Sequence, residues 1–347
     1  MKVLYFGSVE APYQNSFWQE CSKLFNTSNI YLFSKQAGHS WETYNSKDTI
    51  CLEYDKGKVS SLILLFKKIL NFKPDFVIIG GYKMPLSFSC LVISRVFGAK
   101  TLLWMERPLP SSKFLKILKQ TYLKCYCLFL NGILAIGDDA VLAYQNFHTQ
   151  VYNFPYSIDT SKFQDKQKVI DKKLKFIYLG QLIERKGVVE AIEGFMLNES
   201  TDIEFTIVGG GVLEKKIKHL IKNDTRINQL PYADYDSIPQ ILRSHDVLIF
   251  PSRHDGWALT LVESMCAGLF IMGTNNTSSF NEYIINKKNG VEITVNKDVI
   301  NQKIQWCIDH VDLVKDAGPK NQSLIRNSAS NASLSAQELS RLLGLYK

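Results

Sequence analysis

Short apolar runs rich in Val, Ile, Leu and Phe alternate with segments of helical periodicity along most of this chain. Such a short run, bounded by turn residues, is typical of a strand that is buried on both faces of a parallel sheet. The runs form two series, and the strands they predict are 2–6, 30–33, 76–79, 101–104 and 132–136, followed by 176–179, 205–208, 226–230, 247–250 and 270–273. Two such series with intervening helices predict an α/β protein made of two Rossmann-like, doubly wound domains.

The stretch 153–173 is polar and lysine-rich and separates the two series, so it is the expected linker. The predicted domains are therefore 1–157 and 158–330. In 331–347, leucines at helical spacing predict a terminal helix that docks on the body, one option being that it crosses back to the first domain. Ligands of doubly wound folds bind beyond the carboxyl ends of the strands, so functional residues are expected in the loops that follow them.

The composition is that of an ordinary globular protein, with 46% hydrophobic and 21% charged residues in 347 positions, which excludes a disordered chain. No apolar run approaches the roughly 20 residues that cross a bilayer. The first ten residues lack the apolar core of a signal peptide, so the expected location is the cytoplasm. The seven cysteines are scattered without a C-x-x-C pair, and we expect neither a metal site nor a cofactor.

The positive charge of the chain is concentrated in its first half. Residues 1–157 hold 17 Lys and Arg against 10 Asp and Glu, whereas residues 158–347 hold 24 against 23. A one-sided basic excess indicates an anionic partner, which could be nucleic acid, lipid headgroups or a phosphorylated substrate. Nucleic acid is not expected, since neither a recognition helix nor an aromatic RNA-binding signature is present.

Two helical segments of the first half combine lysines with apolar residues. The segment 59–73 mixes Leu, Ile and Phe with three lysines. In 113–128 one predicted helical face is apolar and the opposite arc is basic, with Phe114, Leu115, Leu118, Tyr122 and Cys125 against Lys113, Lys116, Lys119 and Lys124. Two interpretations remain open: helices packed on the core with solvated lysines, or helices that face an anionic bilayer.

The segment 250–268, FPSRHDGWALTLVESMCAG, joins a strand end to a loop and then to a helix that begins near Ala258. Free backbone N–H groups at a helix start can bind a diphosphate. A carboxylate in the second helical turn, Glu263, can hold ribose hydroxyls, and a carboxylate in the loop, Asp255, can reach a second polyol. The alternative is a helix with surface acids.

This segment resembles the E-x7-E region of the retaining GT-B glycosyltransferases of family 4, and the matching positions are Pro251, Ser252, Gly256, Leu259, Glu263, Met265 and Gly268. The first acid of the motif is Asp255 here instead of glutamate. The resemblance implies that Glu263 binds the nucleotide ribose and that Asp255 contacts the donor sugar. It also implies that the donor site is completed by the loop and the first helical residues, namely Gly256, Trp257, Ala258, Leu259 and Thr260.

A second element, FIYLGQLIERKG at 176–187, resembles the family's G-R-L-x-x-x-K-G. Lys186 matches the phosphate-binding lysine, which acts as a point charge. Gln181 stands where the family has arginine, and the adjacent Arg185 is a candidate replacement. The alternative for both cations is a solvated turn.

Weaker signals complete the predicted site. A glycine-rich turn after the strand 205–208 contributes Gly209 and Gly211, Gly7 is expected to follow the first strand, and Tyr232 is either a base-stacking residue or a surface residue. Glu106, in a W-x-E segment that resembles a bacterial branch of the family, either orients the acceptor hydroxyl or pairs with Arg107. The catalytic candidates are thus Asp255, Lys186 and Glu106.

The resemblance implies two domains that face each other across a cleft and a retaining transfer of a hexosyl or N-acetylhexosaminyl group. The donor would be a UDP- or GDP-sugar, and the acceptor a hydroxyl of a lipid-linked or saccharide substrate. It further implies a role in bacterial surface polysaccharide assembly, in the O-antigen and capsule branch, peripherally on the inner face of the plasma membrane. Two alternatives remain: a nucleotide-sugar epimerase, or a non-catalytic nucleotide-sugar binding protein.

Overall fold

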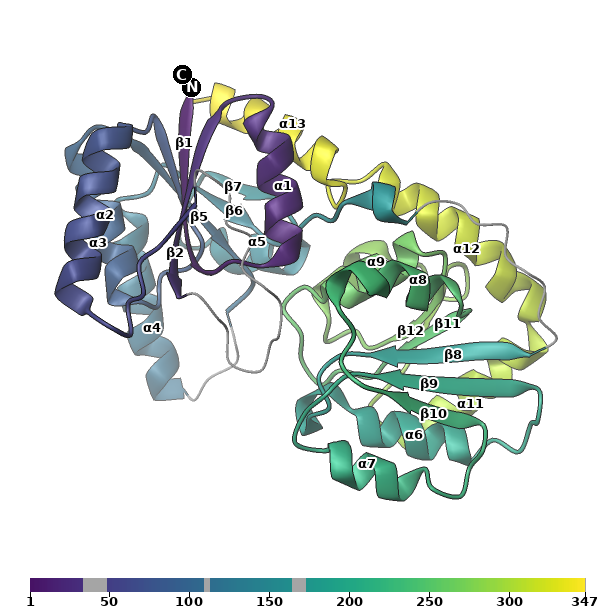
Figure 1. Ribbon diagram of the computed structural model, residues 1–347. Helices are drawn as coiled ribbons and strands as arrows, with labels where there is room; N and C mark the ends of the chain where they lie inside the picture. The colour runs from purple at the N-terminus through teal and green to yellow at the C-terminus, as the bar shows by residue number, and fades with distance from the viewer. Residues whose placement is uncertain (34–48, 109–112, 164–172, 347) are drawn as a thin grey trace. The chain divides into compact units, whose positions relative to one another are not determined.

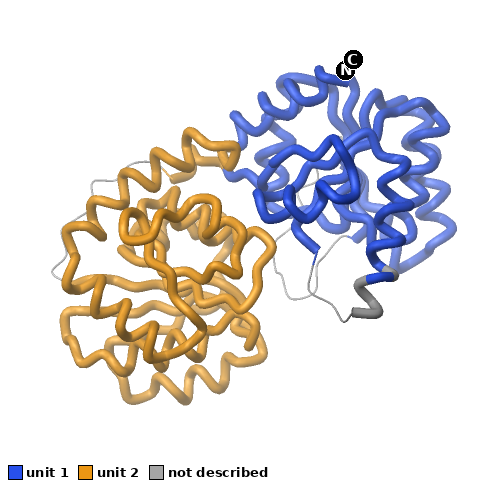
Figure 2. Tube along the Cα trace, turned by 180° about the vertical axis from the view of Figure 1, so that it is seen from behind, with its two compact units in different colours: residues 1–158, 332–347 blue, residues 159–331 orange. Residues whose placement is uncertain are grey.

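The computed structural model describes residues 1–33, 49–108, 113–163 and 173–346 (Figure 1). The chain divides into two compact units (Figure 2). Unit 1 comprises Met1–Ile158 together with Ala332–Lys347, and unit 2 comprises Asp159–Asn331. The last helix of the chain therefore belongs to the same unit as the N-terminal residues.

Unit 1 contains a parallel sheet whose described strands run in the order β3-β2-β1-β4-β5-β6-β7. The strands are β1 (Lys2–Val9), β2 (Asn26–Phe33), β3 (Thr49–Cys51), β4 (Phe76–Ile79), β5 (Lys100–Met105), β6 (Gly132–Ala135) and β7 (Val151–Asn153). Side chains of β1 alternate between the two faces. Leu4 and Phe6 enter the core that the helices after β3 cover, whereas Tyr5 packs on Trp18 at 5.0 Å between ring centroids.

The helices of unit 1 cover both faces of this sheet (Figure 1). They are α1 (Pro12–Ser22), α2 (Lys58–Phe72), α3 (Pro85–Val96), α4 (Lys113–Cys127), α5 (Asp138–Tyr144) and α13 (Ala332–Gly344). Helix α13 packs along α1, and the amide of Ala332 donates to the carbonyl of Ile158 at 3.0 Å. Helices α2 and α3 also pack against each other, and they lie on the other side of the sheet, next to α4.

The buried face of α4 differs from the one predicted. Leu123 and Tyr126 are buried in the core, whereas Tyr122 and Cys125 are exposed. The side chains of Phe114, Leu115, Leu118, Lys113 and Lys116 lie outside the described residues. The periodic pattern is ambiguous because apolar residues occupy more than one face of this helix, and packing on the rest of the core, including the contact of Tyr126 with Phe88 of α3, determines which face is covered.

Unit 2 repeats the strand order of unit 1 as β10-β9-β8-β11-β12-β13, again parallel. Its strands are β8 (Leu174–Leu179), β9 (Ile203–Val208), β10 (Ile227–Leu230), β11 (Val247–Phe250), β12 (Phe270–Gly273) and β13 (Gly290–Glu292). Its helices are α6 (Val188–Met196), α7 (Glu214–Leu220), α8 (Ile238–Arg243), α9 (Leu259–Cys266), α10 (Ser278–Tyr283), α11 (Lys297–Asp309) and α12 (Val311–Arg326). Helix α6 packs on α11, and α9 packs on α12.

Two parallel sheets covered by helices confirm the predicted α/β class with two doubly wound units. Strands β8, β9 and β11 are adjacent or nearly so in their sheet, so the loops after them meet at one edge. Within the described residues, no helix is both long and apolar enough to cross a membrane.

Candidate functional site

Three loops of unit 2 meet at the carboxyl edge of its sheet, after β8, β9 and β11. The β8 and β9 loops are joined by the backbone, since the amide of Leu182 donates to the carbonyl of Gly210 at 2.9 Å. The β8 and β11 loops are joined as well, since the amide of Arg253 donates to the carbonyl of Arg185 at 2.9 Å. The predicted site elements, which are far apart in sequence, therefore form one backbone-linked cluster.

Glycines permit this close approach. A Cβ on Gly209, which has φ +148°, would lie 1.9 Å from the carbonyl oxygen of Gly180. A Cβ on Gly187, which has φ +67° and joins the 3₁₀ turn η2 (Glu184–Lys186) to α6, would lie 2.2 Å from the carbonyl oxygen of Pro251. Gly211 has φ +155°, and a Cβ on it would lie 2.6 Å from the carbonyl oxygen of Leu182 in the β8 loop. No other residue type fits these positions without a shift of the backbone.

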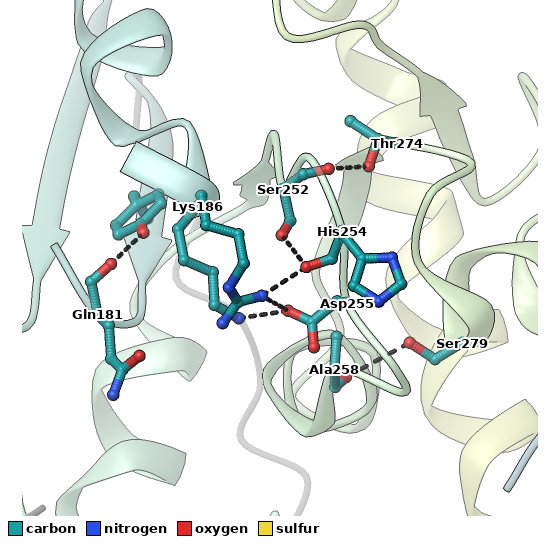
Figure 3. Close-up of polar contacts among 10 residues, drawn as sticks. Gln181, Lys186, Ser252, His254, Asp255, Ala258, Thr274 and Ser279 are labelled. Carbon is teal, nitrogen blue, oxygen red and sulfur yellow. Dashed lines mark hydrogen bonds and ion pairs between the residues drawn. The ribbon is translucent and has the colours of Figure 1, made fainter. Parts of the chain in front are cut away.

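The η2 turn brings a cationic pair to the loop after β11 (Figure 3). The ammonium of Lys186 forms an ion pair with the carboxylate of Asp255, and both side chains are about 15% exposed. Arg185 lies 3.7 Å from the same carboxylate oxygen and also donates to the carbonyl of His254. The Lys186 ammonium lies 5.0 Å from the ring centroid of Phe250, the last residue of β11. Two of the predicted catalytic residues therefore touch each other.

Gln181 lies on the same loop as the cationic pair but apart from it. Its backbone carbonyl accepts a hydrogen bond from the hydroxyl of Tyr178 at 2.8 Å. Its side-chain amide lies away from Lys186 and Asp255 in Figure 3. The buried Tyr178 therefore fixes the backbone at residue 181, whatever side chain this position carries.

Several polar residues that the sequence did not single out hold the two loops together. Arg253 donates to the carbonyl of Glu184 at 2.6 Å and forms an ion pair with Glu190 of α6. Thr274 donates to the carbonyl of Ser252 at 2.6 Å, and Ser252 donates to the carbonyl of His254 at 3.2 Å (Figure 3). No sequence signal distinguishes these residues from ordinary loop polar residues, because their partners are distant in the chain.

Helix α9 begins with an unusual backbone. Its N-cap Ala258 has φ 60° and ψ 78°, in the left-handed region that non-glycine residues rarely adopt, and no side chain caps the helix. The first-turn amides of Leu259 and Thr260 have no carbonyl four residues earlier within the helix to bond to. Strained residues of this kind cost on the order of 1–3 kcal/mol and cluster at functional sites. The helix start thus has N–H groups that can bind an anion.

Glu263 lies one turn further along α9 and is 5% exposed. Burial raises the pKa of its carboxyl to about 7, and among the described residues no hydrogen bond to that carboxyl is found. Tyr232, after β10, is 39% exposed. Burial, then the charge of Glu263, raises the pKa of Tyr232, so the two side chains lie near each other. A buried acid without a partner suits a ligand that donates hydrogen bonds.

Trp257 and Gly256 enter the site only through their backbone. Trp257 is fully buried and packs edge-on against Tyr283, with 5.7 Å between ring centroids. Gly256 is buried as well. The predicted donor contact of Trp257 is therefore restricted to its main chain, because its indole belongs to the core of unit 2.

The candidates of unit 1 lie in a different environment. Gly7 lies within β1, not after it as predicted, and a Cβ on it would meet the ring of Tyr5 at 2.7 Å. Glu106 follows β5, and its backbone carbonyl accepts a hydrogen bond from Tyr144 at 2.9 Å. Arg107, the alternative partner of Glu106, forms an ion pair with Asp139 at 3.3 Å.

The carboxyl edge of the unit 1 sheet is aromatic. Tyr13 packs on Tyr156 in a tilted arrangement at 5.0 Å between centroids, and Tyr156 packs on Trp104 at 5.3 Å. Burial raises the pKa of both tyrosines, and the charge of Glu106 adds to this, which places the carboxyl near their hydroxyls. The sequence predicted a role for Glu106 but not the aromatic residues around it.

No cluster of three His, Cys, Asp or Glu side chains that could hold a metal ion is found among the residues that the structure describes. The positive groups of the unit 2 site are instead Lys186, Arg185 and the amides at the start of α9. This set can bind a polyanion, while Asp255 and the buried Glu263 can accept hydrogen bonds from hydroxyls.

Comparisons with known proteins concern the family and the fold. Residues 159–325 match the family Glycosyl transferases group 1. The uncharacterized glycosyltransferase MJ1178 of Methanocaldococcus jannaschii is 27% identical over 145 residues, which cover 41% of this chain and 40% of that protein. The chain thus aligns with less than half of this curated relative.

Solved structures of similar fold cover the whole chain. HepE (Alr3699) of Anabaena, in complex with UDP, has a TM-score of 0.78 at 12% identity and covers 99% of this chain and 100% of its own. The lipopolysaccharide outer core galactosyltransferase WaaB, in its apo form, has a TM-score of 0.72 at 13% identity over 100% of both chains. At this identity the likeness shows the fold. The expected fold is confirmed as the GT-B fold, and the match of residues 159–325 to group 1 glycosyl transferases supports the expected enzyme class.

Proposed function

We propose that the protein transfers a sugar from a nucleoside diphosphate donor to a hydroxyl group of a saccharide or lipid-linked acceptor. The observation that carries this proposal is the grouping, at one strand edge of unit 2, of a cationic pair, an uncapped helix start and a buried carboxyl to which none of the described residues donates a hydrogen bond. The cations and the helix start suit a diphosphate, and the buried carboxyl suits the hydroxyls of a ribose.

Each part of the donor has a counterpart in the site. Lys186, Arg185 and the amides of Leu259 and Thr260 hold the diphosphate. Asp255 exchanges its ion pair with Lys186 for hydrogen bonds from the donor sugar, which frees the ammonium for the phosphate.

The nucleoside is held by the neighbouring helix and strand end. Glu263 accepts hydrogen bonds from the ribose, and Tyr232 stacks on the base. The loop glycines Gly209 and Gly211 let the ligand approach the backbone.

The donor is a UDP-sugar in this proposal. Support comes from HepE of Anabaena, whose structures hold UDP and UDP-glucose. The transferred group is then a hexosyl or N-acetylhexosaminyl unit. GDP-sugars remain the alternative that a ligand screen decides.

The transfer retains the configuration of the sugar, by attack on the face from which the diphosphate leaves. The leaving phosphate accepts the proton of the acceptor hydroxyl, so no separate base is needed. The protein contributes mainly by stabilising charge on the departing diphosphate, through groups already in position. Glu106 orients the acceptor hydroxyl, and the proposal assigns no step to a metal or another cofactor.

The biological setting that we propose is bacterial surface polysaccharide assembly, in the O-antigen and capsule branch of family 4. The fold likeness to WaaB, which acts in the lipopolysaccharide outer core, supports it. The enzyme would work in the cytoplasm, peripherally on an anionic membrane face that holds a lipid-linked acceptor. The basic excess of unit 1 supports this location.

The first experiment is thermal denaturation of the protein with UDP, GDP, ADP, dTDP and CMP. A ligand at a hundred times its Kd stabilises the folded state by about 2.7 kcal/mol, which shifts the Tm by several degrees. We expect UDP to produce this shift and Glu263→Ala to reduce it by about half or more, since the loss of hydrogen bonds to a charged group costs roughly 1.5–3 kcal/mol. The absence of any shift with all five nucleotides would contradict the proposed donor class.

Product analysis then separates transfer from the two alternatives. Transfer releases UDP only when an acceptor hydroxyl or water is consumed, an epimerase yields an altered UDP-sugar without acceptor, and a binding protein releases nothing. Asp255→Asn is the diagnostic variant, and we expect it to lower turnover more than nucleotide affinity. Equal losses in both would mean that Asp255 only supports the loop.

A further inference from the structure

Large apolar side chains are exposed mainly on one part of unit 1. Of the 24 exposed large apolar residues in the described part of the chain, 14 lie between residues 59 and 129. They are Val59, Leu62, Ile63, Leu64, Phe66 and Leu70 of α2, Phe88, Val92, Val96 and Phe97 in and after α3, and Ile117, Tyr122, Leu128 and Phe129 in and after α4. We call this surface the α2–α4 face.

Helix α2 has two separate apolar stripes. One stripe, at Ser61, Leu65 and Ile69, is buried against the sheet. A second stripe, displaced around the helix, is exposed and contains Val59, Leu62, Ile63, Phe66 and Leu70. These positions recur every three or four residues, so they line one side of the helix. The core therefore does not account for the second stripe.

The three helices form a continuous surface. The rings of Phe66 on α2 and Phe97 after α3 pack edge-on at 5.7 Å between centroids. The rings of Phe88 on α3 and Phe129 after α4 do the same at 6.4 Å. Figure 1 shows α2, α3 and α4 next to one another on the same side of the sheet. An apolar patch of this kind on a folded domain marks an interaction surface.

The charge of this surface has a single sign. Helices α2, α3 and α4 together contain eight Lys and Arg residues and no Asp or Glu. Lys67 lies on α2 beside the exposed stripe, and Lys119 and Lys124 are exposed on α4. Long lysine side chains can bury their methylene groups on apolar surface while the ammonium reaches an anion.

Unit 2 provides the contrast. Five of its described residues are large, apolar and exposed, and they are scattered: Leu197, Val212, Tyr232, Ile285 and Leu324. Its helices α6, α7, α11 and α12 each contain acidic residues, and all but α6 mix them with basic ones. The combination of apolar stripe and uniform positive charge is a property of one face of unit 1.

We propose that the α2–α4 face binds an anionic lipid bilayer, with its apolar residues in the interface and its lysines on lipid phosphates. The inference deepens the proposed function by naming the surface that holds the enzyme beside a lipid-linked acceptor. Charge complementarity selects this occupant. A second copy of the chain would place lysines against lysines, which like-charge repulsion disfavours.

Cosedimentation with vesicles tests the proposal. Wild-type protein is mixed with vesicles of phosphatidylcholine alone and with vesicles that also contain phosphatidylglycerol, at low and high salt. We expect binding at least tenfold stronger to the anionic vesicles and weakened by salt, because each lysine near the surface contributes a factor of about five. Equal binding to both vesicle types, or binding to neither, would overturn the proposal.

Matched variants connect the binding to the face. Ile63→Gln, Val96→Gln and Ile117→Gln combined, and separately Lys67→Glu with Lys119→Glu, should each reduce vesicle binding at least tenfold. The controls change exposed residues of unit 2 in the same way: Leu197→Gln with Ile285→Gln and Leu324→Gln, and Lys215→Glu with Lys216→Glu. Equal losses in the controls would overturn the assignment to this face. A circular-dichroism spectrum and Tm near wild type establish that each variant is folded.

Two further measurements distinguish a lipid bilayer from a second copy of the chain, and lipid docking from donor binding. Loss of a dimer, seen by light scattering, in the apolar variant alone would identify a second copy as the occupant and overturn the lipid proposal. The UDP-induced shift in Tm should be unchanged in every variant, since none lies in the donor site. A retained UDP shift without vesicle binding would remove the docking face and leave the proposed function standing. Vesicle binding without a UDP shift would leave the docking face standing and contradict the proposed donor binding.

Discussion

Units 1 and 2 have the same strand order, but their sheets end in different residues. In unit 2 the carboxyl edge is built of glycines and cations, with Gly209 against the backbone of Gly180 and Lys186 beside Asp255. In unit 1 the corresponding edge is aromatic. There the side chain of Tyr5 fills the space beside Gly7 and Gly80, with its nearest atoms 2.7 and 2.4 Å from where a Cβ would stand.

The comparison teaches that a shared topology does not assign a shared ligand chemistry. Glycines in unit 2 bring backbone groups of separate loops together, which leaves amides and cations to contact a ligand. The glycines in unit 1 accommodate one of the protein's own side chains. Anion binding is therefore expected at the carboxyl edge of the unit 2 sheet. At the corresponding edge of unit 1, aromatic rings are expected to contact ligand groups that carry less charge.

Removal of the Lys186 ammonium from the unit 2 site should have the largest effect. Lys186→Ala should lower kcat/KM by a factor on the order of 10²–10³, since one group that stabilises a departing anion is worth about 2.7–4 kcal/mol. Steady-state transfer from a UDP-sugar measures it. The control is Lys173→Ala, which removes another ion-paired lysine of unit 2, with Glu204 at 2.8 Å, and should leave kcat/KM unchanged. A loss below threefold for Lys186→Ala would mean that the phosphate is held elsewhere.

The second-largest effect is expected from a substitution that disturbs the close packing of the glycine loops. Gly209→Ala forces a Cβ to within 1.9 Å of a carbonyl oxygen at φ +148°, so we expect a loss of roughly 2–3 kcal/mol in the free energy of unfolding. Gly210→Ala is the matched control, because nothing lies within 4 Å of its Cβ position. Urea denaturation of both variants measures the difference. Similar stabilities would show that the loops can separate without cost.

The buried carboxyl of unit 2 should make stability depend on pH. Glu263 has a folded-state pKa of about 7, above its ordinary value of 4.5, so the folded state binds more protons between these two values. Stability from this group is therefore present at low pH and lost as the pH rises through 7. Glu263→Gln should be more stable than wild type by roughly 2–3 kcal/mol at pH 8 and by little near pH 4.5.

Thermal denaturation at both pH values checks this prediction. The control is Glu184→Gln, an acid in the first turn of η2 whose residue is exposed. It should show no such dependence. A difference between Glu263→Gln and wild type that is independent of pH would mean that this carboxyl is paired in the folded protein.

The smallest effect is expected at the position where the β8 loop carries an amide instead of a guanidinium. Gln181→Arg should preserve the fold and raise UDP affinity by up to about 1 kcal/mol, because the new guanidinium would be carried by the same loop as Lys186 and could attract the diphosphate. Isothermal titration with UDP measures it. A fall in affinity would show that Gln181 makes a specific contact that arginine disrupts.

Much of the fold was accessible from the sequence because long buried strands and amphipathic helices have local patterns. All ten predicted strands are present, with ends shifted by a few residues. Strands β3, β7 and β13 were not predicted, because each has only three residues and none carries an apolar run that stands out. The boundary after residue 157 and the one after 330 compare with 158 and 331 in the structure.

The candidate site was only partly accessible from the sequence. The segment 250–268 is contiguous, so its loop, helix start and buried Glu263 follow from the order of residues. Arg253, Glu190 and Thr274 support that segment but carry no local signal. The aromatic neighbours of Glu106 come from three separate segments and escaped prediction for the same reason.

The sequence alone determined two series of buried parallel strands and the polar loops at their carboxyl ends, because hydrophobic periodicity and turn residues act over a few neighbours. Only the tertiary structure decided which residues meet. Lys186 and Asp255 are paired across 69 positions of chain, Tyr5 occupies the space beside Gly7, and the second apolar stripe of α2 stays outside the core. The reason is that contact and exposure depend on how whole elements pack, and no local pattern contains that information.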